Sequence, residues 1–499
     1  MNYFIGADLG TSALKLLLLD ESGTIVKTVT RSYPVSFPAP GWSEQSPEDW
    51  WDAFVSGTRE LICGINPAEI AAIGLGGQMH GLVALDHADR VIRPAILWND
   101  GRTDRETAWL NSEIGKETLS AHTANIAFAG FTAPKLLWMQ EVEPEHFAKI
   151  SKIMLPKDYI NYRLTGVHCT DYSDASGMLL LDVENRSWSK EMLKICHIRE
   201  EQMPTLYESH QVVGKLTPSV AELLGLSDCT LVVAGAGDNA AAAIGTGTVG
   251  EGKCNISLGT SGTIFISSES FSVDPYNALH SFCHADGGYH LMGCILSAAS
   301  CNKWFCEDIL GTDDYAAEQA KITEEQLGQN SIFFLPYLMG ERSPINDTDA
   351  RGTFVGLRMD TRREEMVLAV LEGVAFAIRD CLEIARAQGI QIDTSGLCGG
   401  GAKSALWQKI LANVLNLTLT IPMTEQGPGY GAAMLAMVGA GVYPTAKDAA
   451  DAIVKVKEVI TPDPAITARY DGQYAKFKAI YPAMKELFKK LNTKTNESS

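Results

Sequence analysis

The sequence IGADLGTSALKLLLLD, residues 5–20, contains two apolar runs separated by the small and polar tetrapeptide LGTS at 9–12. The same tetrapeptide returns at 258–261, within NISLGTSGTIFIS (255–267), and again stands between apolar runs. Short apolar runs on either side of a turn-forming segment predict a β-hairpin. The chain therefore repeats one strand–turn–strand unit, once in each half, as a duplicated α/β fold would.

The first hairpin is followed by further strand and helix patterns. Residues 3–8, 13–20 and 24–33 predict an antiparallel meander of three strands. A helix is expected over 46–62, with Ser46 as its N-cap and proline at its first position. Residues 230–247 predict a buried strand, a turn at GAGDN and an alanine-rich helix.

The second half repeats this order of elements. Its clearest helix is expected over 363–389, where apolar residues recur every three or four positions and a glycine ends the pattern. A strand end, a glycine-rich turn and a helix are expected over 396–416. Residues 471–492 are amphipathic, with a break or bend expected at Pro482, and the tail 493–499 is expected to fray.

The chain is too long for one domain. It has 499 residues, whereas single hydrophobic cores stop growing at about 250–300 residues. We place the main boundary in TGTVGEG, which gives a domain at 1–246 with the first turn, a domain at 247–445 with the second turn, and a helical C-terminal segment at 446–499. A hinge at this boundary would leave a cleft between two similar halves.

Charge and composition exclude several classes of partner. The formal net charge is −19, which argues against binding to nucleic acid or to an anionic membrane surface. The sequence has no run of 18 apolar residues and no signal-peptide pattern, and its eleven cysteines include no CxxC pair. We therefore expect a cytoplasmic protein with reduced thiols. The negative charge of any phosphate ligand must therefore be neutralised by N–H groups or cations at its own binding site.

The two LGTS turns are candidate phosphate sites. Gly10 and Gly259 let the backbone approach a ligand without a Cβ atom, and the following residues offer hydroxyl and N–H donors. These donor residues are Thr11, Ser12, Thr260 and Ser261. Two such turns could hold a polyphosphate from both sides. The alternative is that Gly-Thr-Ser only makes a good hairpin turn.

Three further polar residues are candidates for chemistry. Asp8 stands directly before the first turn, where a carboxylate would be repelled by phosphates unless a cation such as Mg²⁺ lay between them. Asp238 follows a buried strand and fits a general base, although an N-cap is equally consistent with its position. His80, in GLGGQMHG, suits a small polar ligand, or it has only a structural role.

Longer motifs resemble a known family. GFTAPKLLWMQ (130–140) and GTFVGLRMDTRREEMVLAVLEG (352–373) resemble the two signatures of the FGGY carbohydrate kinases, which belong to the actin-like ATPase superfamily. GQMHGLVALD (77–86), LPKDY (155–159) and HSFCHA (280–285) resemble the members that act on D-xylulose more than those that act on glycerol, gluconate or ribulose. The resemblance implies two duplicated actin-like, ribonuclease H-like α/β domains with a nucleotide cleft between them.

The resemblance also implies an activity and a set of site residues. The expected reaction is phosphorylation of D-xylulose by ATP with Mg²⁺; the alternatives are a kinase for another small ketose or polyol, such as D-ribulose, and an actin-fold ATPase that binds no sugar. The sequence does not settle the oligomeric state, so a homodimer stays open. The implied roles are phosphate binding by both turns, adenosine contact at Gly400 and Gly401, Mg²⁺ near Asp8, sugar contact by Met79, His80 and Asn239, and proton acceptance by Asp238.

Overall fold

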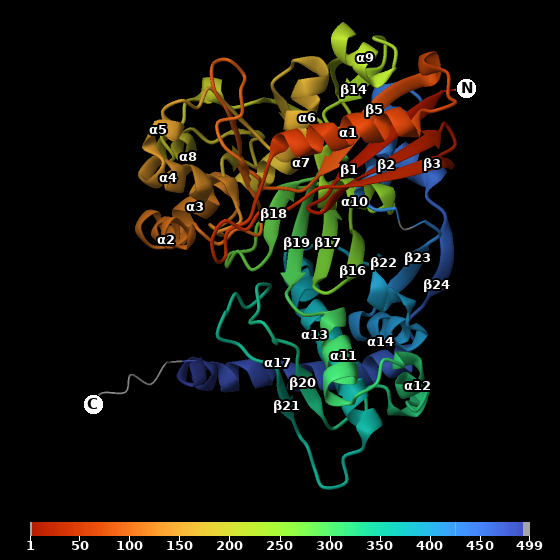
Figure 1. Cartoon of the computed structure of the whole chain (residues 1–499). Helices are drawn as coiled ribbons and strands as arrows, with labels where there is room; N and C mark the ends of the chain where they lie inside the picture. The colour runs from red at the N-terminus through yellow and green to blue at the C-terminus, as the bar shows by residue number, and fades with distance from the viewer. Residues whose placement is uncertain (1, 425, 493–499) are drawn as a thin grey trace.

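The computed structural model describes residues 2–424 and 426–492 and shows two α/β halves, each built on a seven-stranded sheet (Figure 1). The first sheet has the order β13-β14-β5-β1-β2-β3, with β15 paired to β5. Its strands are β1 (Tyr3–Leu9), β2 (Ala13–Asp20), β3 (Ile25–Ser32), β5 (Ile70–Gly77), β13 (Val212–Lys215), β14 (Leu231–Val233) and β15 (Ala236–Gly237).

The second sheet has the order β18-β19-β17-β16-β22-β23-β24. Its strands are β16 (Lys253–Leu258), β17 (Gly262–Ser268), β18 (His280–Cys283), β19 (Tyr289–Ile295), β22 (Thr394–Cys398), β23 (Thr418–Pro422) and β24 (Val456–Ile460). Shorter strands pair outside the two sheets: β4 (Glu44–Gln45) with β7 (Ala95–Ile96), β6 (Val83–Leu85) with β8 (Lys152–Met154), β9 (Cys169–Asp171) with β12 (Thr205–Tyr207), β10 (Leu181–Asp182) with β11 (Ser187–Trp188), and β20 (Phe333–Leu335) with β21 (Thr353–Val355).

The two sheets have the same pairing pattern. In the first, β1 is antiparallel to β2 and parallel to β5, β2 is antiparallel to β3, and β5 is parallel to β14, which is antiparallel to β13. In the second, β16, β17, β19, β22, β23 and β24 repeat these relations in the same order. The predicted duplication is therefore confirmed, and each LGTS turn joins the first two strands of its half.

Helices surround both sheets. Those of the first half are α1 (Pro47–Leu61), α2 (Asp104–Trp109), α3 (Lys116–Thr123), α4 (Thr132–Val142), α5 (Pro144–Phe147), α6 (Pro156–Thr165), α7 (Tyr172–Ala175), α8 (Lys190–Ile195), α9 (Pro218–Leu224) and α10 (Asp238–Gly245). Those of the second half are α11 (Ala299–Trp304), α12 (Tyr315–Gln319), α13 (Arg363–Ala387), α14 (Ala405–Leu415), α15 (Pro428–Gly439), α16 (Ala446–Ile453) and α17 (Pro464–Asn492).

Several helix predictions are confirmed, and two details are wrong. α1 begins at Pro47 as expected, but the Ser46 side chain makes no capping hydrogen bond. α13 has its predicted apolar face buried, and Gly389 follows its end with φ of +88°. α17 continues through Pro482, so the predicted break there is wrong, while the alternative, a bend, stays a prediction. The predicted frayed tail, 493–499, lies outside the described residues, and the segment from 446 also supplies strand β24.

Helix α15 joins the two halves. It follows β23 of the second sheet, yet it packs against β1, β5 and α10 of the first half. In Figure 1 a blue segment of the chain therefore lies beside the red strands at the top right. Glycines make this contact possible. A Cβ atom would lie 1.9 Å from the Gly429 oxygen if added to Gly6, and 1.8 Å from the Ala241 oxygen if added to Gly431. Both separations are too short for any side chain.

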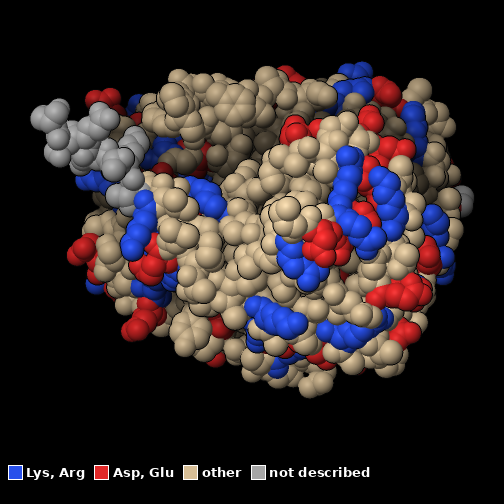
Figure 2. Space-filling model, turned by 90° about the horizontal axis from the view of Figure 1, so that it is seen from below, with Lys and Arg blue, Asp and Glu red and all other residues tan. Residues whose placement is uncertain are grey.

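Charged side chains of both signs share one face of the molecule. Figure 2 shows one face, seen from below, on which Lys and Arg side chains stand among Asp and Glu side chains. Across residues 2–424 and 426–492, no helix is both long enough and apolar enough to span a bilayer. All eleven cysteines are free thiols, as the sequence predicted.

We predict that Gly431→Ala lowers the free energy of unfolding by about 3 kcal/mol, because the new methyl group forces α15 away from α10. The matched control is Gly472→Ala in α17, where an added Cβ meets open space and the better helix propensity of alanine should add up to about 1 kcal/mol. Thermal unfolding of both variants measures this difference. Equal stability of the two variants would contradict the proposed close packing.

Candidate functional site

Two carboxylates flank the end of β5. The strand register pairs Asp8 of β1 with Gly76, and Gly237 of β15 with Gly77. Asp238 follows Gly237 and is the first residue of α10. Because β1 and β15 both run parallel to β5, their carboxyl ends meet at one edge of the sheet. Two of the predicted site residues, Asp8 and Asp238, therefore come together.

The pKa values of both carboxyl groups are raised. The pKa of Asp8 is raised to about 7, mainly by burial and also by the charge of Asp238, although Lys15, opposite on β2, acts to lower it. Burial also raises the pKa of Asp238 to about 6, although hydrogen bonds from Asn239 act to lower it. The Asn239 backbone N lies 2.7 Å and its Nδ2 lies 3.0 Å from Asp238 Oδ1. Two carboxylates in a partly buried site are oxygen ligands of the kind that Mg²⁺ prefers. The residues present thus fit the predicted ion.

The segment after β5 carries Met79 and His80 to the same place. A Cβ atom on Gly237 would lie 3.0 Å from Met79 Cγ, and one on Gly177 would lie 2.4 Å from His80 Cε1. His80 Nδ1 lies 2.7 Å from the Gly177 oxygen. Burial lowers the pKa of His80 to about 3, so the ring is neutral; Nδ1 donates to Gly177, which leaves Nε2 as an acceptor. Met79 thus lies against Gly237, the residue before Asp238, and His80 follows Met79 in the chain.

Residues of the 130–140 motif contact His80 and fix its position. The His80 backbone oxygen accepts hydrogen bonds from Thr132 Oγ1 at 3.0 Å and from Lys135 Nζ at 2.8 Å, and the backbone has φ of +69°. Lys135 Nζ also donates to the Gly130 oxygen at 2.7 Å, and burial lowers the pKa of this lysine to about 7. The His80 ring stacks on Phe131 with centroids 4.7 Å apart. The motif therefore holds a strained loop in place.

A fully buried charge cluster lies behind Asp238. Lys157 Nζ lies 2.6 Å from Asp158 Oδ1, 2.9 Å from Asp171 Oδ1 and 3.4 Å from Asp174 Oδ2, and all four side chains are completely buried. Burial raises the pKa of Asp174 well above its usual range. Ser173 Oγ donates to Asp171 and accepts from the Gly237 N–H group at 3.1 Å. Through Ser173 the cluster thus fixes the N–H group of Gly237, the residue before Asp238. Sequence reasoning missed it, because LPKDY is also typical of an exposed helix start.

The first LGTS turn is braced through its carbonyl groups. Tyr33 OH donates to the Gly10 oxygen at 2.5 Å, and Gln45 Nε2 donates to the Thr11 oxygen at 2.6 Å. Trp98 Nε1 donates to Thr11 Oγ1 at 2.9 Å, and the Ser12 oxygen accepts from the Tyr33 N–H group at 3.3 Å. Because carbonyl oxygens repel phosphate, a turn whose carbonyls are already paired is better suited to present its N–H groups to an anion.

The second turn adjoins the predicted adenosine residues. The oxygens of Gly259 and Thr260 accept from the first residues of the α11 region at 2.9 Å. Gly399 has φ of +90°, and a Cβ atom there would lie 2.7 Å from the oxygen of Leu258, directly before the turn. A Cβ atom on Gly401 would lie 3.0 Å from Leu258 Cβ, whereas one on Gly400 would meet open space. That both turns hold one nucleotide stays a prediction.

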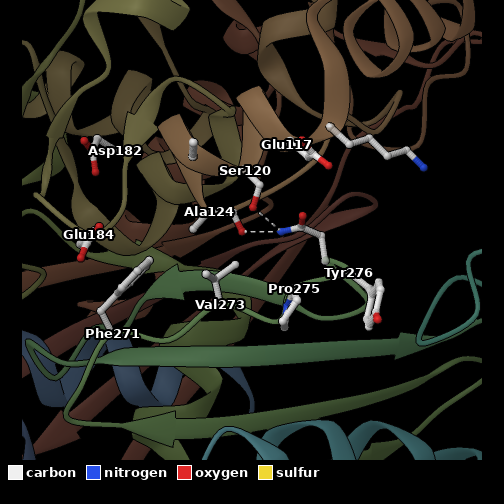
Figure 3. Close-up of a pocket in the computed structure, with 12 residues that line it drawn as sticks. Glu117, Ser120, Ala124, Asp182, Glu184, Phe271, Val273, Pro275 and Tyr276 are labelled. Atoms are coloured by element: carbon white, nitrogen blue, oxygen red, sulfur yellow. Dashed lines mark hydrogen bonds between the residues drawn. The ribbon is translucent and has the colours of Figure 1, made fainter.

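A separate pocket lies between α3 and residues 271–277 (Figure 3). Its volume is about 560 Å³, and none of the predicted site residues lines it. Asn277 Nδ2 donates to Ser120 Oγ at 3.0 Å and to the Ala124 oxygen at 3.1 Å. Nearby, Asn125 Nδ2 donates to the Ser281 oxygen at 2.8 Å. These bonds connect the two halves at a place away from α15.

Comparisons with known proteins identify the family of the chain. Models of the N-terminal and C-terminal domains of the FGGY family of carbohydrate kinases match residues 3–245 and 254–440. The chain is 44% identical to a xylulose kinase of Escherichia coli over 88% of this chain and 90% of that protein, and 40% identical to one of Klebsiella pneumoniae over 97% and 99%. A solved structure from Brucella ovis, described as a xyloylose kinase, superposes with a TM-score of 0.91 at 41% identity, covering 97% of this chain and all of that one.

We predict that Lys157→Met lowers the free energy of unfolding by about 3–5 kcal/mol, because it leaves buried aspartates without a cation. The matched control is Lys447→Met, which removes an exposed lysine that pairs with Asp451 at 2.5 Å and should cost less than about 1 kcal/mol. Denaturant unfolding of both variants gives the comparison. A loss at Lys157 no larger than that of the control would show that the buried cluster does not depend on its lysine.

Proposed function

Because this chain belongs to the FGGY family of carbohydrate kinases, we propose that it transfers the γ-phosphoryl group of ATP to the 5-hydroxyl group of D-xylulose, giving D-xylulose 5-phosphate and ADP. The observation that supports this most is the position of Asp238, between Asp8 on one side and the Met79–His80 segment on the other. A base in that position can reach both a sugar hydroxyl group and the phosphate side of the site. Full-length similarity to xylulose kinases supports the choice of sugar.

Asp238 acts as the base in this reaction. With a pKa of about 6 it is largely ionised at neutral pH. Its carboxylate accepts a hydrogen bond from the 5-hydroxyl group and orients that oxygen toward the γ-phosphorus. As the new O–P bond forms and the bond to the bridging oxygen of ADP breaks, the proton passes to Asp238. Transfer is late, because an alcohol is acidic enough to lose its proton to a carboxylate only once it is bonded to phosphorus.

The remaining roles concern charge and position. Bound Mg²⁺, held near Asp8, would neutralise phosphate charge. The Gly10 and Gly259 turns direct N–H groups at the phosphates, and Gly400 and Gly401 leave room for the adenosine. Met79 and His80 contact the sugar, with His80 Nε2 accepting from a hydroxyl group. The buried lysine cluster and the 130–140 motif keep Asp238 and His80 in place.

The first experiment measures ATP turnover against a panel of pentuloses, hexuloses and polyols. D-xylulose should give the highest kcat/KM, and little ADP should form without sugar. A higher kcat/KM with D-ribulose or a polyol would reassign the sugar. Steady ADP release that no sugar accelerates would instead indicate an actin-fold ATPase without a sugar substrate.

The second experiment tests the base. Asp238→Asn should lower kcat by about 10²–10⁴-fold, since the amide cannot take the proton, while ATP affinity changes less than about threefold. Asp471→Asn on α17, whose carboxylate is 55% exposed, serves as the matched control and should leave kcat unchanged. Steady-state kinetics and calorimetric titration with ATP supply the two readouts. A kcat within tenfold of the unaltered enzyme would exclude Asp238 as the base.

A further inference from the structure

The sugar side of the site borders the other half of the molecule through an aromatic seam of Phe128, Phe131, His280 and Phe282. Ring centroids lie 5.1 Å apart for Phe128 and His280 and 5.6 Å apart for Phe131 and His280. His80 stacks on Phe131 at 4.7 Å, so its ring is continuous with the seam. His280 and Phe282 belong to β18 of the second sheet. The wall beside His80 is therefore built by both halves.

Arg342 of the second half reaches this wall. Its guanidinium carbon lies 5.5 Å from the centre of the Phe128 ring. The backbone around Arg342 is fixed to its own half, since Glu341 Oε1 accepts from the Leu296 and Arg342 N–H groups, both at 2.8 Å, and the Ser343 N–H group donates to the Cys294 oxygen at 3.0 Å. The loop thus holds a positive side chain across the boundary between the halves.

The N–H donors of the Arg342 guanidinium group have no acceptor partner among the described residues. Across residues 2–424 and 426–492, no salt bridge or hydrogen bond engages the Arg342 side chain, although the residue is only partly exposed. Burial lowers the pKa of His80 and of His280, and the charge of Arg342 adds to the effect at both. Arg342 lies over the Phe128 ring, which contacts His280 and Phe131, and Phe131 stacks on His80. Arg342 therefore lies at the His80 end of the site. A guanidinium offers five N–H donors in a fixed fork and gains most from neighbouring oxygen acceptors.

We propose that Arg342 determines sugar specificity: its guanidinium donates hydrogen bonds to the carbonyl oxygen and the 1-hydroxyl group of the ketose, at the end opposite the hydroxyl group that meets Asp238. This inference rests on the proposed function and deepens it. The first half supplies the base and the contacts near the reacting hydroxyl group, and the second half binds the keto end. A site built to hydrogen-bond a substrate oxygen discriminates strongly against analogues that lack it.

The test compares D-xylulose with 1-deoxy-D-xylulose, which lacks only the 1-hydroxyl group. For Arg342→Gln, the KM for D-xylulose should rise roughly 10- to 100-fold, since a charge-assisted hydrogen bond is lost. The preference for D-xylulose over the deoxy analogue, as a ratio of kcat/KM values, should fall at least about fivefold. The KM for ATP and the sugar-free release of ADP should stay within about twofold of the unaltered enzyme. A merely structural role would weaken both sugars alike.

Two further variants complete the test. Arg342→Lys keeps the positive charge but loses the forked arrangement of N–H donors. It should therefore keep part of the affinity for D-xylulose and less of the discrimination against the deoxy analogue. Arg358→Gln removes an arginine on the same half that is 63% exposed and pairs with Asp360, and it should change neither. If Arg342→Gln does not fold, as judged by thermal unfolding, the lysine variant decides the question, and its discrimination should still fall at least about threefold.

The outcomes separate the two proposals. An unchanged discrimination ratio in the glutamine variant, or in the lysine variant if only that one folds, overturns the inference about Arg342 while leaving the kinase assignment intact. A rise in the KM for ATP equal to that for the sugar also overturns it. If the unaltered enzyme phosphorylates no ketose at all, the proposed function fails first, and the inference about Arg342 fails with it.

Discussion

The rest of the structure depends on a contact between main chains, where α15 lies on β1, β5 and α10 at separations that only glycine permits. Gly6 and Gly431 bring the backbone of α15 against the two elements that carry Asp8 and Asp238. Asp8 stands at the end of β1, and Asp238 begins α10, so the helix sets how far apart the two carboxylates lie. The same packing buries them, and burial raises the pKa values of both. The close packing of main chains thus also determines the ionisation of the two carboxyl groups at the reacting end of the site.

Local patterns in the sequence predicted most of the fold. The LGTS turns, the meander and α13 depend on neighbouring residues, and the structure confirms them. The position of α15 could not be predicted in this way. Its sequence, PGYGAAMLAMVG, is apolar or small on nearly every side, and its partners lie hundreds of residues away on strands whose glycines show no periodicity.

The candidate site was predicted only in part. Asp8, Met79, His80 and Asp238 stand in short motifs, and the structure brings them together, while their roles stay predictions. Lys157 and Arg342 were missed because a charged residue next to a helix start or in a loop is normally exposed. Their significance appears only when their burial and their neighbouring groups are known, and these depend on contacts between distant segments.

The hydrogen bonds from Asn277 to α3 and from Asn125 to Ser281 have a mechanical consequence. The aromatic contacts of His280 with Phe128 and Phe131, and the hydrogen bonds from Arg186 to the oxygens of Gly287 and Gly288, also cross between the halves on this side. α15 joins the halves at a different place. A motion that separated the halves at the sugar end would have to break these contacts, so the wall beside His80 is tied to both sheets at once.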